Sequence, residues 1–75
     1  MSLRQLIIKT FPNSSIPKDI RQLKMGDIEE WDSMGNFNLI LAVEQHYGVQ
    51  FNLDDMEKIK SVREIIKALG NDFSE

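Results

Sequence analysis

The stretch Trp31-Asp32-Ser33-Met34-Gly35 opens a strongly apolar segment, residues 33–47, of this 75-residue chain. An acidic residue ahead of such a segment is a typical helix N-cap, and a glycine such as Gly48 is a typical helix end. The sequence therefore predicts a helix over 33–47 with Asp32 as its N-cap. We expect the Ser33 hydroxyl at the start of this helix, where unpaired backbone N–H groups and the helix dipole favour a phosphate.

The part of the chain before this segment carries a second helix signal. Ser2 and Gln5 predict a capping box, and Pro12 predicts the end of the helix that follows. Residues 12–32 are expected to form a long loop with a short helical turn over 17–23. The apolar residues expected to face the core from this part are Leu3, Leu6, Ile7, Phe11, Ile16, Ile20, Leu23, Ile28 and Trp31.

Two further helices are predicted after the central one. Residues 49–51 are too short for a sheet strand and are expected to be extended, after which Asn52 or Asp54 caps a short third helix that ends at Lys58. Ser61 and Glu64 predict a capping box for a last helix, which ends at Gly70. Its expected core residues are Val62, Ile65, Ile66 and Leu69. The chain is therefore predicted to be an all-α single domain over 1–75, with 71–75 as a frayed tail.

Composition narrows the classes of function. The net charge of −3 and the pI near 5.0 argue against a nucleic-acid binder, which needs clustered basic residues. The chain has no cysteine, so thiol chemistry would have to come from an attached group. No apolar run approaches the roughly 20 residues that span a bilayer, and residues 1–4 do not open a signal peptide. We expect a soluble, cytoplasmic monomer that does not insert into membranes.

The central helix is too apolar for one face. On a helical wheel at about 100° per residue its apolar side chains sweep about 220°, which is wider than a surface helix needs. One interpretation is a helix buried on two sides. The other is that Met34, Phe37 and Leu41 remain exposed as a docking patch beside Ser33. The other apolar residues of the helix fall in a neighbouring sector of the wheel, which is expected to face the core; they are Leu39, Ile40, Val43 and Tyr47.

Catalytic and metal-binding interpretations are weaker. The one histidine, His46, lies 13 residues after Ser33 on the same predicted helix, or roughly 20 Å away at 1.5 Å per residue. Ser33 and His46 are therefore too far apart for a serine hydrolase. The acidic residues lack the spacing of a calcium loop and are expected to form a solvated face; they are Glu29, Glu30, Asp54, Asp55 and Glu57.

In the order and spacing of its predicted helices and of the Asp32-Ser33 dipeptide, the chain resembles the acyl carrier proteins. Asp32-Ser33-Met34 is similar to the family's Asp-Ser-Leu motif, in which a phosphopantetheinyl transferase attaches 4′-phosphopantetheine from coenzyme A to the serine. Residues 39–44 and 47–51 resemble the family's second helix and the crossing after it. Residues 54–59 resemble its short third helix, and 61–66 its last helix. The resemblance is strongest from Trp31 to Leu69. It implies a small four-helix bundle of acyl-carrier type with a long first loop and a short third helix.

The resemblance also implies a mechanism. Ser33 would hold the phosphopantetheine, flanked by Asp32 and Met34, and the terminal thiol of the arm would carry an acyl or aminoacyl group to loading and transfer enzymes. The expected partner-binding residues are Met34, Phe37, Asn38, Leu41, Glu44 and Met56. The expected cargo pocket consists of Ile40, Val43, Met56, Ile59 and Ile65. The chain itself would not be an enzyme.

Departures from the family pattern bear on the pathway. Met34 replaces the usual leucine, and Gly35 and Asn38 stand where many carriers of fatty-acid synthesis have acidic residues. Asn36, Gln45 and His46 are also neutral, which leaves Glu44 as the main charge of the helix. Together with Trp31, this is more similar to carriers of dedicated biosynthetic pathways. The alternative to a carrier is an unmodified helical adaptor that binds partners through Met34, Phe37 and Leu41.

Overall fold

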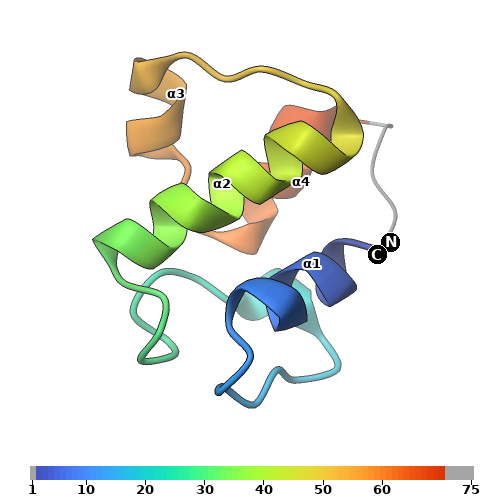
Figure 1. Ribbon diagram of the computed structural model, residues 1–75, viewed down its shortest axis with the longest axis vertical. Coiled ribbons are helices and arrows are strands. Elements are labelled where there is room, and N and C mark those ends of the chain that lie inside the picture. Colours follow the sequence, from blue (N-terminus) through green and yellow to red (C-terminus); the bar gives the residue numbers. More distant parts are fainter. Residues whose placement is uncertain (1, 71–75) are drawn as a thin grey trace.

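The computed structural model describes residues 2–70, and this part of the chain is all-helical (Figure 1). It contains four α-helices, a 3-10 turn and no β-strand, so the predicted all-α class is confirmed for these residues. An isolated antiparallel bridge pairs Lys24 with Ser61. The predicted frayed tail, 71–75, lies outside the described residues. The elements are α1 (Leu3–Thr10), η1 (Ile20–Gln22), α2 (Ser33–Tyr47), α3 (Leu53–Lys58) and α4 (Val62–Leu69).

Local capping signals set the bounds of the helices. The Asp32 carboxylate accepts a hydrogen bond from the Gly35 N–H at 2.8 Å, and Gly48 ends α2 in the left-handed conformation with φ of 69°. Both bounds of α2 are as predicted, because side-chain capping and positive φ are properties of single residues. The Ser2 capping box of α1 is complete, and Asn52, not Asp54, caps α3.

Two local predictions need correction. The turn expected over 17–23 is confined to Ile20–Gln22, because the Asp19 carboxylate accepts from the Arg21 N–H and starts the turn only there. At α4, Ser61 Oγ accepts from the Glu64 N–H as predicted. The Glu64 carboxylate, however, accepts from the N–H of Lys60 and not from that of Ser61.

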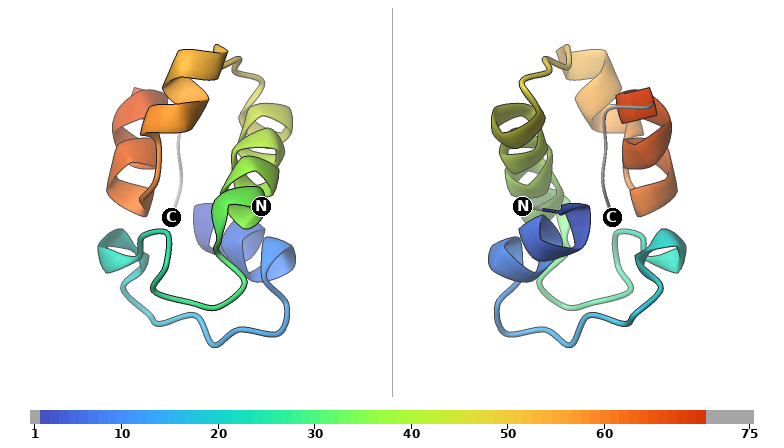
Figure 2. Two further views of the ribbon diagram at one scale, coloured as in Figure 1. Left: turned by 90° about the vertical axis from the view of Figure 1, so that its left-hand side faces the viewer. Right: turned by 90° about the vertical axis from the view of Figure 1, so that its right-hand side faces the viewer.

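The core lies between α2 and α4, with α3 at one end and η1 and the loop before α2 at the other (Figure 2). Helix α1 packs on α2, and α4 packs on η1. Trp31 is fully buried, and its ring stacks on Phe11 with centroids 5.6 Å apart. Most of the predicted inward residues are buried, and the exceptions are half-buried, namely Ile16, Ile28, Tyr47 and Ile66. The buried apolar residues are Leu3, Leu6, Ile7, Phe11, Ile20, Leu23, Trp31, Leu39, Ile40, Val43, Ile59, Val62, Ile65 and Leu69.

The long loop is held by specific hydrogen bonds. Glu30 Oε1 accepts from the Asn13 N–H at 2.9 Å and from Ser14 Oγ at 2.8 Å. The prediction that Glu30 belongs to a solvated acidic face is therefore wrong, because its carboxylate joins the two ends of the loop. The loop thus delivers the chain to Trp31 in a fixed position.

Within residues 2–70 no helix is both long enough and apolar enough to cross a lipid bilayer.

Candidate functional site

Ser33 is the first residue of α2, and its side chain is exposed. Its hydroxyl makes no hydrogen bond with the described residues, and neither do the backbone N–H groups of Ser33 and Met34. These are two of the donors that the start of any helix leaves unpaired. The site therefore combines an accessible hydroxyl with two backbone donors, which is an arrangement suited to a phosphate ester.

The residues on either side of Ser33 fix its position. Trp31 is buried two residues before it, and Gly35 is buried two residues after it. A Cβ built on Gly35 would collide with the carbonyl oxygen of Glu30 and lie 3.0 Å from Cε1 of Phe11. The start of α2 therefore rests directly on the loop backbone. Gly35 has no room for a side chain here, so this position cannot present an acidic docking group.

Asn36 links the start of α2 to the end of α3. Its Oδ1 accepts from Trp31 Nε1 at 2.9 Å, and its Nδ2 donates to the Ile59 carbonyl oxygen at 2.7 Å. The side chain is only 6% exposed. The prediction that Asn36 adds to a neutral surface is therefore wrong. It lies three and four residues before Leu39 and Ile40, which places it on the buried stripe of the helix.

A groove of about 470 Å³ lies next to Ser33, lined by residues from the start of α2 and from α3. Four of its lining residues are apolar, and two others, Glu57 and Lys60, carry opposite charges. Asp32, before Ser33, uses one carboxylate oxygen to cap α2. The lining residues are Met25, Ser33, Asn36, Phe37, Leu53, Met56, Glu57 and Lys60.

The structure distinguishes the two interpretations of the apolar α2 surface. Met34 is 73% exposed and Phe37 is 45% exposed, so neither is a core residue. Leu41 is half-buried, and Asn38 is exposed. The α2 side chains Met34, Phe37 and Asn38 are therefore accessible and uncharged, whereas Leu41, predicted to be exposed with them, is partly covered.

The other predicted partner residues are placed differently. Glu44 Oε2 accepts from the Phe51 N–H at 2.6 Å, so this carboxylate also anchors the crossing after α2. Met56 is half-buried and lines the groove. Glu44 and Met56 therefore have structural contacts of their own, in contrast to Met34, which is 73% exposed.

The predicted cargo residues do not gather around one opening. Met56 alone among them lines the groove. The other four are close-packed core residues with at most 6% of their surface exposed, namely Ile40, Val43, Ile59 and Ile65.

Leu53 is a groove residue that the sequence analysis missed. It is 73% exposed, on the first turn of a helix that has no buried residue. The sequence did indicate that Leu53 is exposed. A large apolar residue directly after the N-cap of so short a helix lies at the end of the helix, away from the core. Leu53 and Phe37 form the apolar part of the groove together with the two methionines.

No three His, Asp or Glu side chains within residues 2–70 lie close enough together to hold a metal ion. A scan against models of known protein families found no match, and searches of curated proteins and of solved structures found none either.

Proposed function

We propose that this chain is an acyl or aminoacyl carrier protein with a fold of acyl-carrier type, modified by 4′-phosphopantetheine on Ser33. The observation that carries the proposal is the exposed Ser33 at the start of α2, beside two unpaired backbone N–H groups and a groove of about 470 Å³. A tethered arm needs an accessible hydroxyl, donors for its phosphate and a surface on which to rest. All three lie together here.

The fit of the residues to the prosthetic group supports the proposal. The N–H groups of Ser33 and Met34 would face the phosphodiester, and the positive end of the α2 dipole favours its charge. Met25, Phe37, Leu53 and Met56 offer apolar surface to the arm or its cargo. When bound, the group supplies the thiol that this cysteine-free chain lacks.

A carrier role is favoured over catalysis by Ser33 itself. A serine nucleophile needs a base within hydrogen-bond reach, and the Ser33 hydroxyl has no hydrogen-bond partner among residues 2–70. Proton removal during the modification therefore falls to the transferase. Ser33 Oγ forms the new O–P bond, and the adenosine bisphosphate half of coenzyme A leaves.

The neutral side chains on the exposed face of α2 support a dedicated pathway rather than housekeeping fatty-acid synthesis. A cytoplasmic location is part of the same proposal. Met34 and Phe37 are exposed beside Ser33, and Gly35 and Asn38 bring no charge to this region. Partner enzymes that read acidic side chains at these positions would find none. Loading and transfer enzymes with apolar contact surfaces fit better.

Intact-protein mass spectrometry tests the proposal. After incubation with coenzyme A and a broad-specificity phosphopantetheinyl transferase, the chain should gain the mass of one phosphopantetheine. Ser33→Ala should gain nothing, whereas the matched control Ser15→Ala, in the exposed part of the loop, should be modified fully. No gain by the unaltered chain, with a transferase that modifies another carrier, would exclude the carrier function.

The second candidate is an unmodified adaptor, which the exposure of Met34 and Phe37 favours. Such an adaptor would bind partners equally well with Ser33→Ala. A carrier would lose cargo transfer with the same change.

A further inference from the structure

The charges of the chain are separated along the sequence. Residues 25–57 hold eight Asp and Glu and no Lys or Arg, a net charge of −8. The rest of the chain holds all nine Lys and Arg and four acidic residues, a net charge of +5. The overall charge of −3 therefore conceals an acidic central segment, a basic segment over 1–24 with a net charge of +4, and a nearly neutral segment over 58–75 with a net charge of +1.

The fold brings the segments that flank the acidic one side by side. The Met25 N–H donates to the Lys60 carbonyl oxygen at 2.8 Å, and the Val62 N–H donates to that of Leu23 at 3.0 Å. Helix α4 packs on η1, and its Arg63 Nε donates to the Arg21 carbonyl oxygen at 3.2 Å. Positions 42 residues apart in the sequence thus share one surface.

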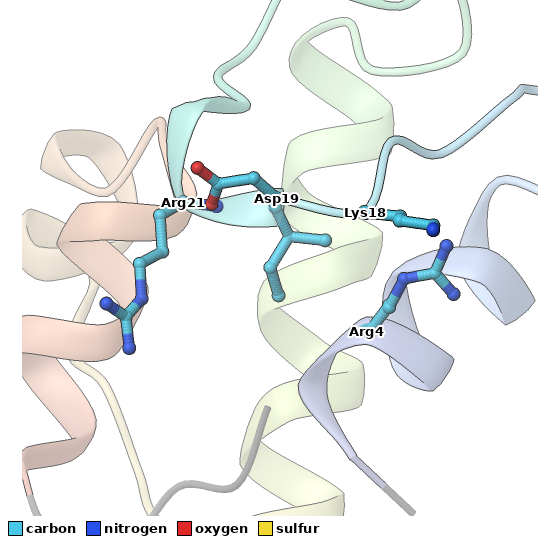
Figure 3. A pocket seen from close by; sticks show the side chains of 5 residues that line it. Arg4, Lys18, Asp19 and Arg21 are labelled. Carbon is cyan, nitrogen blue, oxygen red and sulfur yellow. The ribbon is translucent and has the colours of Figure 1, made fainter.

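Arginine and lysine side chains surround a shallow depression beside η1. The depression has a volume of about 380 Å³ and is lined by Arg4, Lys18, Asp19, Ile20 and Arg21. Figure 3 shows Arg4 and Lys18 close together on one side and Arg21 on the other. With Arg63 from α4, these cations form what we call the basic patch: Arg4, Lys18, Arg21 and Arg63.

The one acidic residue of the depression is already engaged with its own turn. Asp19 Oδ1 accepts from the Arg21 N–H at 3.1 Å, and Oδ2 accepts from Gln22 Nε2 at 3.4 Å. Arg4 donates from Nη2 to the Ile16 carbonyl oxygen at 3.3 Å, while Lys18 makes no hydrogen bond or ion pair within residues 2–70. The patch therefore keeps an excess of positive charge toward solvent.

The form of the patch indicates the class of its ligand. Its cations come from α1, the loop, η1 and α4 and are spread over an open surface, and every buried side-chain polar atom of the described residues has a partner. This is not a closed site for a small anion. Guanidinium groups pair with carboxylates through two parallel hydrogen bonds. The arginines of the basic patch therefore suit a peptide with several acidic side chains.

Lipid and nucleic acid fit the patch less well. The large exposed apolar residues within 2–70 are Ile8, Met34, Phe37 and Leu53, and none of them belongs to the patch, so the described part of the patch offers no apolar side chain that would enter a bilayer. The basic patch as defined has no aromatic side chain on which a base could stack. We propose that the basic patch binds an acidic peptide segment of a partner protein.

Binding at the patch leaves the Ser33 site accessible. The groove beside Ser33 and the depression beside η1 have no residue in common. Helix α2 begins at one side of the molecule in Figure 1, whereas α1, which carries Arg4, begins at the other. A partner could therefore hold the chain by the patch while a second protein acts on Ser33. The inference stands whether or not Ser33 is modified.

A titration of the ¹⁵N-labelled chain with a hexaglutamate peptide at low ionic strength tests the proposal. The largest amide shift changes should fall at the four patch residues and their chain neighbours, and they should vanish at high salt, which screens exposed charges. The double substitution Arg4→Glu/Arg63→Glu should weaken binding by about tenfold, since it reverses two favourable charge contacts.

The matched control is Lys9→Glu/Lys58→Glu, which makes the same change in net charge outside the patch. It should alter the affinity by less than about twofold. Equal weakening by both double variants, or shift changes spread over all lysines, would show a response to net charge alone and overturn the proposal. Tighter binding to vesicles of phosphatidylcholine and phosphatidylserine, or to oligothymidylate, would also overturn it by assigning the patch to lipid or nucleic acid.

Discussion

The indole nitrogen of Trp31 donates a hydrogen bond of 2.9 Å to the side-chain oxygen of Asn36, and both side chains are buried. Ser33 lies between these two residues in the sequence, so the bond closes a short loop of chain around the candidate attachment point. The other end of the Asn36 amide holds the Ile59 carbonyl oxygen. The Asn36 side-chain amide thus positions both Ser33 and the end of α3, the helix that lines the groove beside Ser33.

Asn36→Ala should lower the free energy of unfolding by about 2–4 kcal/mol, because it leaves the Trp31 N–H and the Ile59 carbonyl buried without partners. Urea unfolding followed by the fluorescence of Trp31, the single tryptophan, measures the loss. The control is Asn38→Ala, because the Asn38 side chain is exposed on the same helix. This substitution gains the same helix propensity, at most about 0.7 kcal/mol, without removing a buried hydrogen bond. Equal stabilities of the two variants would contradict the role assigned to Asn36.

Gly35→Ala should destabilise the chain by about 1–2 kcal/mol even though alanine favours helices by about 1 kcal/mol over glycine. The added Cβ would collide with the Glu30 carbonyl oxygen, which is backbone and cannot rotate away. Thermal unfolding measured by circular dichroism shows the sign of the effect. A raised melting temperature would mean that the loop moves aside at little cost.

Asp32→Ala should cost about 1 kcal/mol of stability, because it removes the N-cap that accepts from the Gly35 N–H. Asp32→Asn keeps a capping oxygen and should stay within about 0.5 kcal/mol of the unaltered chain. In the proposed modification of Ser33, the two variants separate the effect of the helix cap from that of the charge, because Asp32→Asn removes only the charge. If Asp32→Asn is modified as slowly as Asp32→Ala, the transferase reads the carboxylate and not the helix start.

Phe37→Ala should reduce the kcat/KM of modification or cargo transfer by about tenfold, since an exposed aromatic residue is a typical anchor of a protein interface. Its stability should fall by less than about 1 kcal/mol, because the side chain is 45% exposed. Leu39→Ala, fully buried two residues later, should instead cost about 2–5 kcal/mol. A large stability loss with unchanged transfer in Phe37→Ala would show that this ring is structural.

Glu44→Ala should destabilise the chain by about 1–2 kcal/mol, because the half-buried Phe51 N–H loses a charged acceptor 2.6 Å away. The Phe51 amide should also exchange faster with solvent. Glu44→Gln retains an acceptor and should show a smaller loss. The exposed Glu57, changed to alanine, should move stability by no more than about 0.5 kcal/mol. Unchanged exchange at Phe51 in Glu44→Ala would contradict the anchoring role.

The sequence by itself determined the bounds of the helices and the location of Ser33. Asp32 and Gly48 cap and end α2 through bonds to residues at most four positions away, so their effect does not depend on the rest of the fold. The cap of α3 was left open between Asn52 and Asp54, and the structure shows that it is Asn52. The spacing of apolar residues likewise indicated the buried stripes of α1 and α4. These are local properties of the chain, and the structure confirms them.

Only the tertiary structure decided which polar residues are structural and which surfaces exist. Asn36 is buried because Ile59, 23 residues away, supplies an acceptor for its amide, and Glu30 is tied down by residues 16 and 17 positions earlier. The groove beside Ser33 and the basic patch are each assembled from segments that meet only in the folded chain. Such contacts depend on long-range packing, which residue type and spacing do not encode locally, so the site and its neighbouring surfaces became visible only with the fold.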